Sequence, residues 1–158
     1  MNVVLDEGAI MPVKAHKTDA GFDIFARYTF IVPECSHHLL VRDLGFAYPP
    51  KAETSVGYAV HDTGVHIEIP KGYVGFLKSK SGLNVNHSIT SEGVIDSGYT
   101  GSIVVKLYNH SSVPYTIEKG DKISQLVILP ISDVDELTLV DTLNETDRGD
   151  NGFGSTGK

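Results

Sequence analysis

The stretch KSKSGLN (78–84) carries residue types that could hold a phosphate chain. It places two lysines, two serines and a glycine within seven positions. Lysine ammonium groups, hydroxyl groups and a backbone that can approach closely are what phosphate oxygens require. A solvent-exposed turn has the same composition, so this stretch taken by itself favours an ordinary turn.

The stretch GVIDSGYTG (93–101) could supply a general base. Its Asp-Ser-Gly sequence is typical of a tight hairpin turn. Val94 and Ile95 beside Asp96 predict an apolar setting, in which a carboxylate can accept a proton. Tyr99 adds a flat aromatic ring after the turn. The alternative for Asp96 is a purely structural role as the cap of this turn.

Residues 120–130, GDKISQLVILP, combine a turn with a strand. Asp121 lies in the predicted turn, and Gln125 is a polar interruption of an apolar run. The amide of Gln125 either pairs within the protein or contacts a ligand, and the pattern leaves both interpretations open.

The last residues, RGDNGFGSTGK (148–158), cannot order by themselves, because glycine loses the most backbone freedom on folding. A disordered terminus is one interpretation of this stretch. The other is that the Gly-Phe-Gly sequence carries the ring of Phe153 into a tight contact, with Arg148 nearby.

β-Structure must position these stretches, since short runs rich in Val, Ile, Tyr and Phe alternate with sixteen glycines and seven prolines. The predicted strands are YTFIVP (28–33), VHIEIP (65–70), GYVGFLK (72–78), SIVVKLYN (102–109), YTIEKG (115–120), KISQLVILP (122–130) and LTLV (137–140). A single short turn of helix near 81–87 is the most helix that the pattern allows. The fold class is therefore all-β, sandwich or barrel-like.

Length and composition indicate one soluble domain with a core, from 158 residues of which 41% are hydrophobic. The net charge of -7 argues against a general nucleic-acid binder. Cys35 is the only cysteine, so no internal disulfide is possible. No apolar run approaches the roughly 20 residues that span a membrane, and no signal peptide is evident, so a cytoplasmic location is expected.

Taken together, the stretches resemble the five ordered motifs of the trimeric deoxyuridine triphosphatases (dUTPases). The matching segments, in order, are TDAGFDIFA (18–26), KSGL (80–83), GVIDSGYTG (93–101), GDKISQLV (120–127) and RGDNGFGSTG (148–157). Each motif alone is ambiguous, but the ordered set is highly specific.

The resemblance implies a jelly-roll-like β domain of the dUTPase-like β-clip type, assembled as a homotrimer with composite active sites. Residues 1–146 would form this domain, and residues 147–158 would form a flexible arm that closes over an active site. The implied reaction is hydrolysis of dUTP to dUMP and pyrophosphate with Mg²⁺, by attack of water on the α-phosphorus.

The resemblance also implies roles for individual residues. Asp96 would activate the attacking water, Tyr99 would exclude a 2′-hydroxyl, and Asp23 would hold Mg²⁺ through water. The implied substrate-binding residues are Lys80, Ser81, Gly82, Thr90, Gly93, Val94, Ile95, Tyr99, Val104, Gln125, Arg148, Phe153, Gly154, Ser155 and Thr156. Among them, the backbone around 93–95 would pair with the uracil edge and Phe153 would cover the uracil.

The chain departs from the family pattern at three places. Lys80 stands where arginine is usual, which keeps the charge but loses the bidentate fork. Thr90 stands where some members have an asparagine that touches the base. The link between the first two motifs is longer than usual, and the excess is predicted at 39–58.

Two alternatives stay open at this stage. One is the dCTP deaminase branch, which shares the fold; Tyr99 and the complete Phe-Gly-Ser-Thr pattern of the tail favour the triphosphatase. The other is a nucleotide-gated regulator that binds a protein partner through 39–58.

Overall fold

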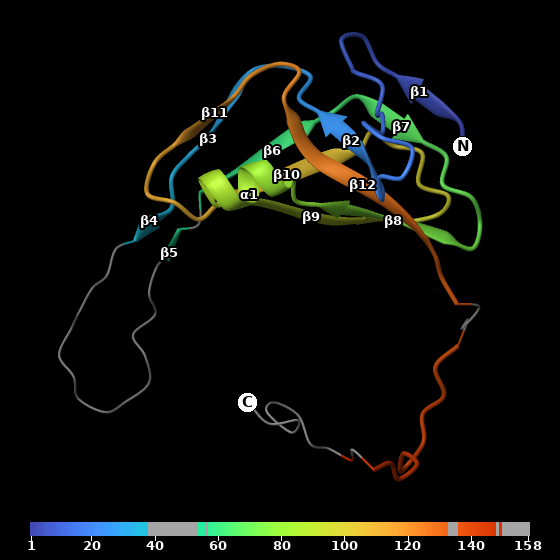
Figure 1. Cartoon of the computed structure of the whole chain (residues 1–158). Coiled ribbons are helices and arrows are strands. Elements are labelled where there is room, and N and C mark those ends of the chain that lie inside the picture. Colours follow the sequence, from blue (N-terminus) through green and yellow to red (C-terminus); the bar gives the residue numbers. More distant parts are fainter. Residues whose placement is uncertain (38–53, 56, 133–135, 148, 150–158) are drawn as a thin grey trace, which may run out of the picture.

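The described part of the chain folds around one curled antiparallel sheet (Figure 1). The computed structural model describes residues 1–37, 54–55, 57–132, 136–147 and 149. Its elements are β1 (Val3–Leu5), β2 (Gly21–Phe25), β3 (Phe30–Val32), β4 (Ser36–His37), β5 (Thr54–Ser55), β6 (Gly57–Asp62), β7 (Val65–Ile67), β8 (Tyr73–Lys78), α1 (Ser81–His87), β9 (Ile89–Ile95), β10 (Val104–Asn109), β11 (Tyr115–Ile117) and β12 (Lys122–Pro130). The six-stranded sheet has the order β2-β12-β8-β9-β10-β6.

Three two-stranded pairs complete the fold, namely β1 with β7, β3 with β11, and β4 with β5. Figure 1 shows β3 and β11 at one end of the molecule and β1 and β7 at the other. This all-β architecture confirms the predicted fold class, and the described residues hold a single helix, α1. That helix is longer than the single turn expected for 81–87.

Strand β9 divides its pairing between two neighbours. Residues 92–95 pair with β8, whereas residues 89–91 pair with residues 107–109 of β10. The first half of β10, residues 104–106, pairs with β6 on its other side. The sheet is therefore open between 92–95 of β9 and the start of β10, next to the turn that carries Asp96.

The core follows from the alternation of side chains along the strands. The alternation of apolar and polar residues in VHIEI (65–69) predicts one buried face, and in β7 Val65 and Ile67 are indeed buried while His66 between them lies on the opposite, partly exposed face. Completely buried side chains from all parts of the large sheet meet inside the curl; they include Ile24, Ile89, Val105, Leu107, Ile123 and Leu126. Burial of these aliphatic groups is the main stabilisation of a fold of this kind.

Two strand predictions need correction. LTLV (137–140) is not a strand, and the side chains of Leu137 and Leu139 are 96% and 98% exposed. An apolar run becomes a strand only when a neighbouring edge pairs with it, and the described residues offer none there. In the other case, Pro49-Pro50 and the polar spacers of residues 37–62 predict an excursion from the core, yet residues 57–62 form β6 and pair with the whole of β10.

Two residues of the predicted extra segment 39–58 belong to the large sheet. Gly57 and Tyr58 were assigned to the extra segment 39–58, but they are the first residues of β6. Before them, His37 of β4 pairs with Thr54 of β5, so these two strands hold the two ends of the segment 38–53 next to each other. Thr54 and Ser55 form β5, and the rest of the predicted extra segment, residues 39–53 and 56, lies outside the described residues.

In the part of the chain that the structure describes, no helix is long and apolar enough to cross a membrane.

Candidate active site

A buried carboxylate with two lysines forms the charged centre of the first candidate region. Asp23 of β2 is only 5% exposed. Its Oδ1 lies 2.5 Å from Nζ of Lys80, and its Oδ2 lies 2.8 Å from Nζ of Lys122. Burial alone raises the pKa of Asp23, but the hydrogen bonds and positive charges of Lys122 and Lys80 outweigh it, so the pKa lies below its ordinary value.

The pairing of strands explains this convergence. Gln125 of β12 lies opposite both Asp23 of β2 and Lys78 of β8, because β12 runs between these two strands. The chain leaves β8 at Lys78 and enters α1 directly after Lys80, which folds the lysine back over β2. Lys122 at the start of β12 completes the group, and nothing in the sequence pattern had singled it out.

Buried serines fix the backbone that carries Lys80. Ser79 Oγ accepts a hydrogen bond from the Ser91 amide at 3.0 Å and donates to the Ser91 carbonyl at 3.2 Å. The hydroxyls of Ser91 and Ser124 are 3.0 Å apart. Gln125 Nε2 donates to the Ser79 carbonyl at 3.2 Å, which is the structural pairing that the sequence had left open.

A groove of about 340 Å³ lies beside this charged centre. Its lining residues come from α1, β11 and the start of β12, and they are Lys80, Gly82, Leu83, Asn86, His87, Tyr115, Asp121 and Lys122. Ser81 is exposed at the first position of α1. The predicted residues Lys80, Ser81 and Gly82 therefore lie together with Lys122 at an open surface. The two ammonium groups of Lys80 and Lys122 make this arrangement suited to a polyanion.

The second candidate region is the turn after β9. The Tyr99 amide donates to the Asp96 carbonyl at 3.2 Å, and Gly98 has φ of 89°, so residues 96–99 form a turn. The predicted tight hairpin is wrong, because residues 92–95 pair with β8 and not with the start of β10. A left-handed residue at the third position is what a type II turn requires, and glycine adopts it without strain. Asp96 itself is exposed.

The described residues do not provide the apolar setting expected for Asp96. Ile95 is buried, but the side chain of Val94 is 59% exposed, because the pleat of β9 turns it away from the core. Any apolar cover for Asp96 must therefore come from outside the described part of one chain.

The open part of the sheet lies directly before this turn. Residues 93–95 pair with β8 on one side, and residues 104–106 pair with β6 on the other side. The two edges by which these segments face each other are therefore not paired. The predicted residues Gly93, Val94, Ile95 and Val104 all border this opening. A planar group with both donors and acceptors along one edge could pair with such backbone, as a strand would.

Thr90 was also predicted to touch the substrate. Its hydroxyl lies 2.8 Å from Nε2 of His110, a side chain on the segment after β10. The structure thus gives Thr90 a partner within the fold.

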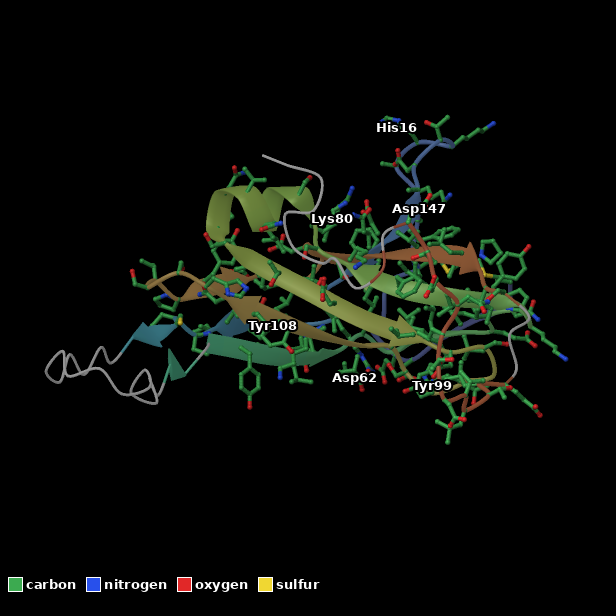
Figure 2. The ribbon with its side chains drawn as sticks, turned by 90° about the horizontal axis from the view of Figure 1, so that it is seen from below. His16, Asp62, Lys80, Tyr99, Tyr108 and Asp147 are labelled. Atoms are coloured by element: carbon green, nitrogen blue, oxygen red, sulfur yellow. The ribbon has the colours of Figure 1, made fainter. Side chains whose placement is uncertain are left out.

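The two candidate regions do not meet within one chain. Ser91 is bonded to Ser79, next to Lys80, whereas Asp96 lies five positions further along β9. At about 3.3 Å per strand residue, this separation is roughly 16 Å. Figure 2 shows Lys80 and Tyr99 well apart from each other.

Side chains outside the predicted set hold the loop between the turn and β10. His66 Nδ1 donates to the Thr100 carbonyl at 2.8 Å, and its Nε2 lies 3.3 Å from Oδ1 of Asp6. The Thr100 hydrogen bond, more than the opposing desolvation, raises the pKa of His66, and Asp6 adds to the effect. A second anchor joins Ser102 to Asp62. Only tertiary contacts reveal these residues, since no motif contains both partners.

The tail residues predicted to bind substrate, Arg148, Phe153, Gly154, Ser155 and Thr156, lie outside the described residues. Of the predicted arm 147–158, only residues 147 and 149 are among the described residues.

The described residues contain no group of three or more metal-ligating side chains. A metal site in this chain would therefore depend on Asp23 and on oxygen ligands from elsewhere.

Comparison with known proteins identifies relatives across nearly the whole chain. The family model described as dUTPase matches residues 42–157. The deoxyuridine 5′-triphosphate nucleotidohydrolase of Eremothecium gossypii is 36% identical over 152 residues, which are 96% of this chain and 86% of that protein.

Two solved structures are also similar. A mutant dUTPase of Staphylococcus bacteriophage 80alpha with dUpNHpp has a TM-score of 0.79 and 30% identity, covering 99% of this chain and 98% of that one. A mutant dUTPase from phage phi11 of Staphylococcus aureus, described with a structural Mg(II) ion, has a TM-score of 0.70 and 30% identity, covering 91% and 98%.

Proposed function

Because the chain belongs to the dUTPase family, it hydrolyses dUTP to dUMP, and we propose that it does so in a site that two or more copies of the chain build together. The family model covers most of the chain, and the related proteins are named for this reaction. Pyrophosphate is the other product, since hydrolysis to the monophosphate breaks the bond between the α- and β-phosphates.

One observation carries the proposal of a shared site. The base candidate Asp96 lies roughly 16 Å along β9 from the serines that hold Lys80. Proton abstraction needs the base within hydrogen-bond reach of the attacking water, and that water must sit at the α-phosphorus. A triphosphate bound at Lys80 and Lys122 cannot also meet Asp96 of the same chain at this distance, so a second copy supplies Asp96. Cyclic repetition of such a head-to-tail contact closes a homotrimer.

The charged centre is the triphosphate-binding part of this site. Lys80 and Lys122 supply two positive charges, and Ser81 and Gly82 supply hydroxyl and backbone donors at the edge of the same groove. Gln125 acts indirectly, because its amide holds the backbone of Ser79. A lysine at position 80 binds as a point charge, without the planar fork of an arginine.

The opening between β9 and β10 is the nucleoside-binding part. Uracil presents two carbonyls and one N–H along one edge, which matches free backbone groups of 93–95 and 104–106. The ring of Tyr99 stands at the end of this opening, where the deoxyribose follows the base. Arg148, Phe153, Gly154, Ser155 and Thr156 of the arm cover the bound nucleotide and exclude water from the developing charge.

Mg²⁺ fits this site through a water-mediated contact with Asp23. Each carboxylate oxygen of Asp23 is already within hydrogen-bond distance of a lysine, and the two ammonium charges disfavour a direct bond between this carboxylate and a second cation. Mg²⁺ commonly keeps several waters and takes its other ligands from substrate phosphates. When bound, the ion would neutralise phosphate charge as a Lewis acid.

Asp96 then performs the proton transfer. Its carboxylate accepts a proton from the water as the oxygen attacks the α-phosphorus, opposite the departing pyrophosphate. Lys80 and Lys122 stabilise the negative charge that accumulates on the phosphates during this step.

The direct test incubates the purified protein with dUTP and with dCTP, with and without Mg²⁺, and separates the products by ion-exchange chromatography. The proposal requires dUMP and pyrophosphate from dUTP. Ammonia released from dCTP would instead indicate the deaminase branch. Tight binding of dUTP without turnover would indicate a nucleotide-gated binding protein.

A further inference from the structure

The ring of Tyr99 is held in place by its own hydroxyl group. Tyr99 Oη donates a hydrogen bond to the Ser102 carbonyl at 2.9 Å, across the short loop that leads into β10. Gly101 passes directly beneath the ring: a Cβ atom at this position would lie 2.4 Å from Tyr99 Oη. The ring is otherwise 45% exposed, so this contact and this close approach determine where it stands.

Ser102 is fixed in turn by Asp62, a residue outside the five motifs. The Ser102 hydroxyl donates to Oδ1 of Asp62, and the same oxygen accepts the Gly64 amide at 3.0 Å. Asp62 ends β6 and lies opposite Val104 at the start of β10, so it is anchored in the large sheet. Figure 2 shows Asp62 and Tyr99 on the same side of the sheet. These hydrogen bonds, the one from Ser102 above all, hold the pKa of Asp62 below its ordinary value.

We propose that Asp62 is a positioning residue for sugar discrimination: through Ser102 it holds the Tyr99 ring where a 2′-hydroxyl of a ribonucleotide would have to be. The inference rests on the proposed function, because it assumes that Tyr99 faces the deoxyribose. A ring excludes one additional hydroxyl only if it cannot swing aside, and a carbonyl on a loose loop would move with the ring. Anchoring the acceptor to β6 removes this freedom.

The experiment compares Asp62→Ala with Asp62→Asn, and measures kcat/KM for dUTP and for UTP. Specificity is the ratio of these two values, and a general loss of structure lowers both together. In the alanine variant the ratio should fall about fivefold, the equivalent of one lost hydrogen bond. The asparagine variant should stay within about twofold of wild type, since its amide oxygen can accept both donors that Oδ1 accepts.

Two further variants make the comparison sharper. Tyr99→Phe keeps the ring but loses the hydroxyl, so its ratio should fall by a similar factor, and Asp62→Ala added to it should lower the ratio little further. Ser97→Ala removes a different hydroxyl contact of the same loop, 3.3 Å from the Ile69 carbonyl, and should leave the ratio unchanged.

Clear results would overturn the proposal. An unchanged ratio in Asp62→Ala and Tyr99→Phe, in proteins that retain dUTP hydrolysis, would refute it while leaving the proposed function intact. Equal losses in the alanine and asparagine variants would show that the charge of Asp62 acts, and not its position. Absence of dUTP hydrolysis in the wild-type protein would overturn the proposed function, and this inference with it.

Discussion

Nζ of Lys122 on β12 lies 2.8 Å from Oδ2 of Asp23 on the neighbouring strand β2, and Lys80 occupies the other carboxylate oxygen. The pair joins a buried carboxylate to a cation at the mouth of a groove. Lys122 therefore serves both the fold and the proposed phosphate site, and the two contributions can be separated by experiment.

Lys122→Met should weaken nucleotide binding by about tenfold, the effect of losing one charge-assisted hydrogen bond. It should also lower the free energy of unfolding, because Asp23 keeps only one of its two cations. Isothermal titration with a non-hydrolysable dUTP analogue and urea unfolding measure the two effects. Lys78→Met is the matched control: it removes an exposed pair with Glu92, 3.6 Å long, which should matter little. Equal effects of both variants would contradict a special role for Lys122.

Asp96→Asn should reduce kcat for dUTP by at least about 100-fold, the low end for removal of a general base. The amide has the shape of the carboxylate but cannot accept the proton of the attacking water. KM should change far less, since Asp96 is separate from the groups that hold the phosphates. Steady-state kinetics on the folded trimer check this expectation, and a kcat close to that of wild type would exclude Asp96 as the base.

Mixed trimers can test whether the base and the cations come from different chains. One parent carries Asp96→Asn, and the other carries Asp23→Asn, Lys80→Met and Lys122→Met, so that no buried charge is left unpaired. In a cyclic trimer with shared sites, each mixed trimer contains one junction with both intact parts. Each isolated mixed trimer therefore has one working site of three and should show roughly a third of the wild-type activity.

Co-expression with two different affinity tags isolates the mixed trimers for this assay. If the base and the cations of one chain act together, mixing cannot build an intact site. Doubly tagged trimers no more active than the parents would therefore argue against shared sites.

Replacing residues 38–53 by Asn-Gly should leave assembly and turnover close to wild type. His37 and Thr54 are paired opposite each other at the end of β4 and β5, and an Asn-Gly type I′ turn joins such a pair directly. Every residue proposed for the site lies outside the exchanged segment. Size-exclusion chromatography with light scattering and the dUTP assay measure the result, and failure to assemble would assign the segment to the trimer itself.

His61 should make the protein less stable in acid. Desolvation in the core lowers its pKa to about 4, with the Arg27 charge adding to the effect and Asp62 opposing it. Its Nε2 accepts the Arg27 amide at 2.8 Å, so the neutral form is the one that fits. Because the unfolded chain binds the proton near the ordinary pKa of 6.5, stability is complete above this pH and falls as the pH drops towards 4.

The loss amounts to about 3 kcal/mol over this window, at 1.36 kcal/mol per pKa unit. Urea unfolding between pH 7.5 and 4.5 should show the decline, and His61→Phe should flatten it. His66→Gln is the control, because the pKa of His66 is raised and its removal leaves the acid-side decline in place. A decline that persists unchanged in His61→Phe would assign the acid sensitivity to other groups.

The sequence alone determined the features that depend on local chemistry. Alternation in 65–69 identified the buried face of β7, and the Asp-Ser-Gly sequence identified the turn at 96–99. The order of the five motifs was sufficient to identify the family, because each motif is a short run of residues that can be recognised in the linear chain. These features can be identified without knowing which residues are neighbours in the folded protein.

Tertiary structure decided everything that depends on a partner strand. The exposed stretch 137–140 has the composition of a strand but no pairing edge among the described residues, whereas 57–62 looked like a linker and pairs along its whole length with β10. Lys122 became a site residue only because β12 lies beside β2. Likewise, the anchoring of Tyr99 by Asp62 joins segments that are remote in the chain. Such contacts depend on strand register, which is set by packing across the whole sheet and cannot be derived from the local residue pattern.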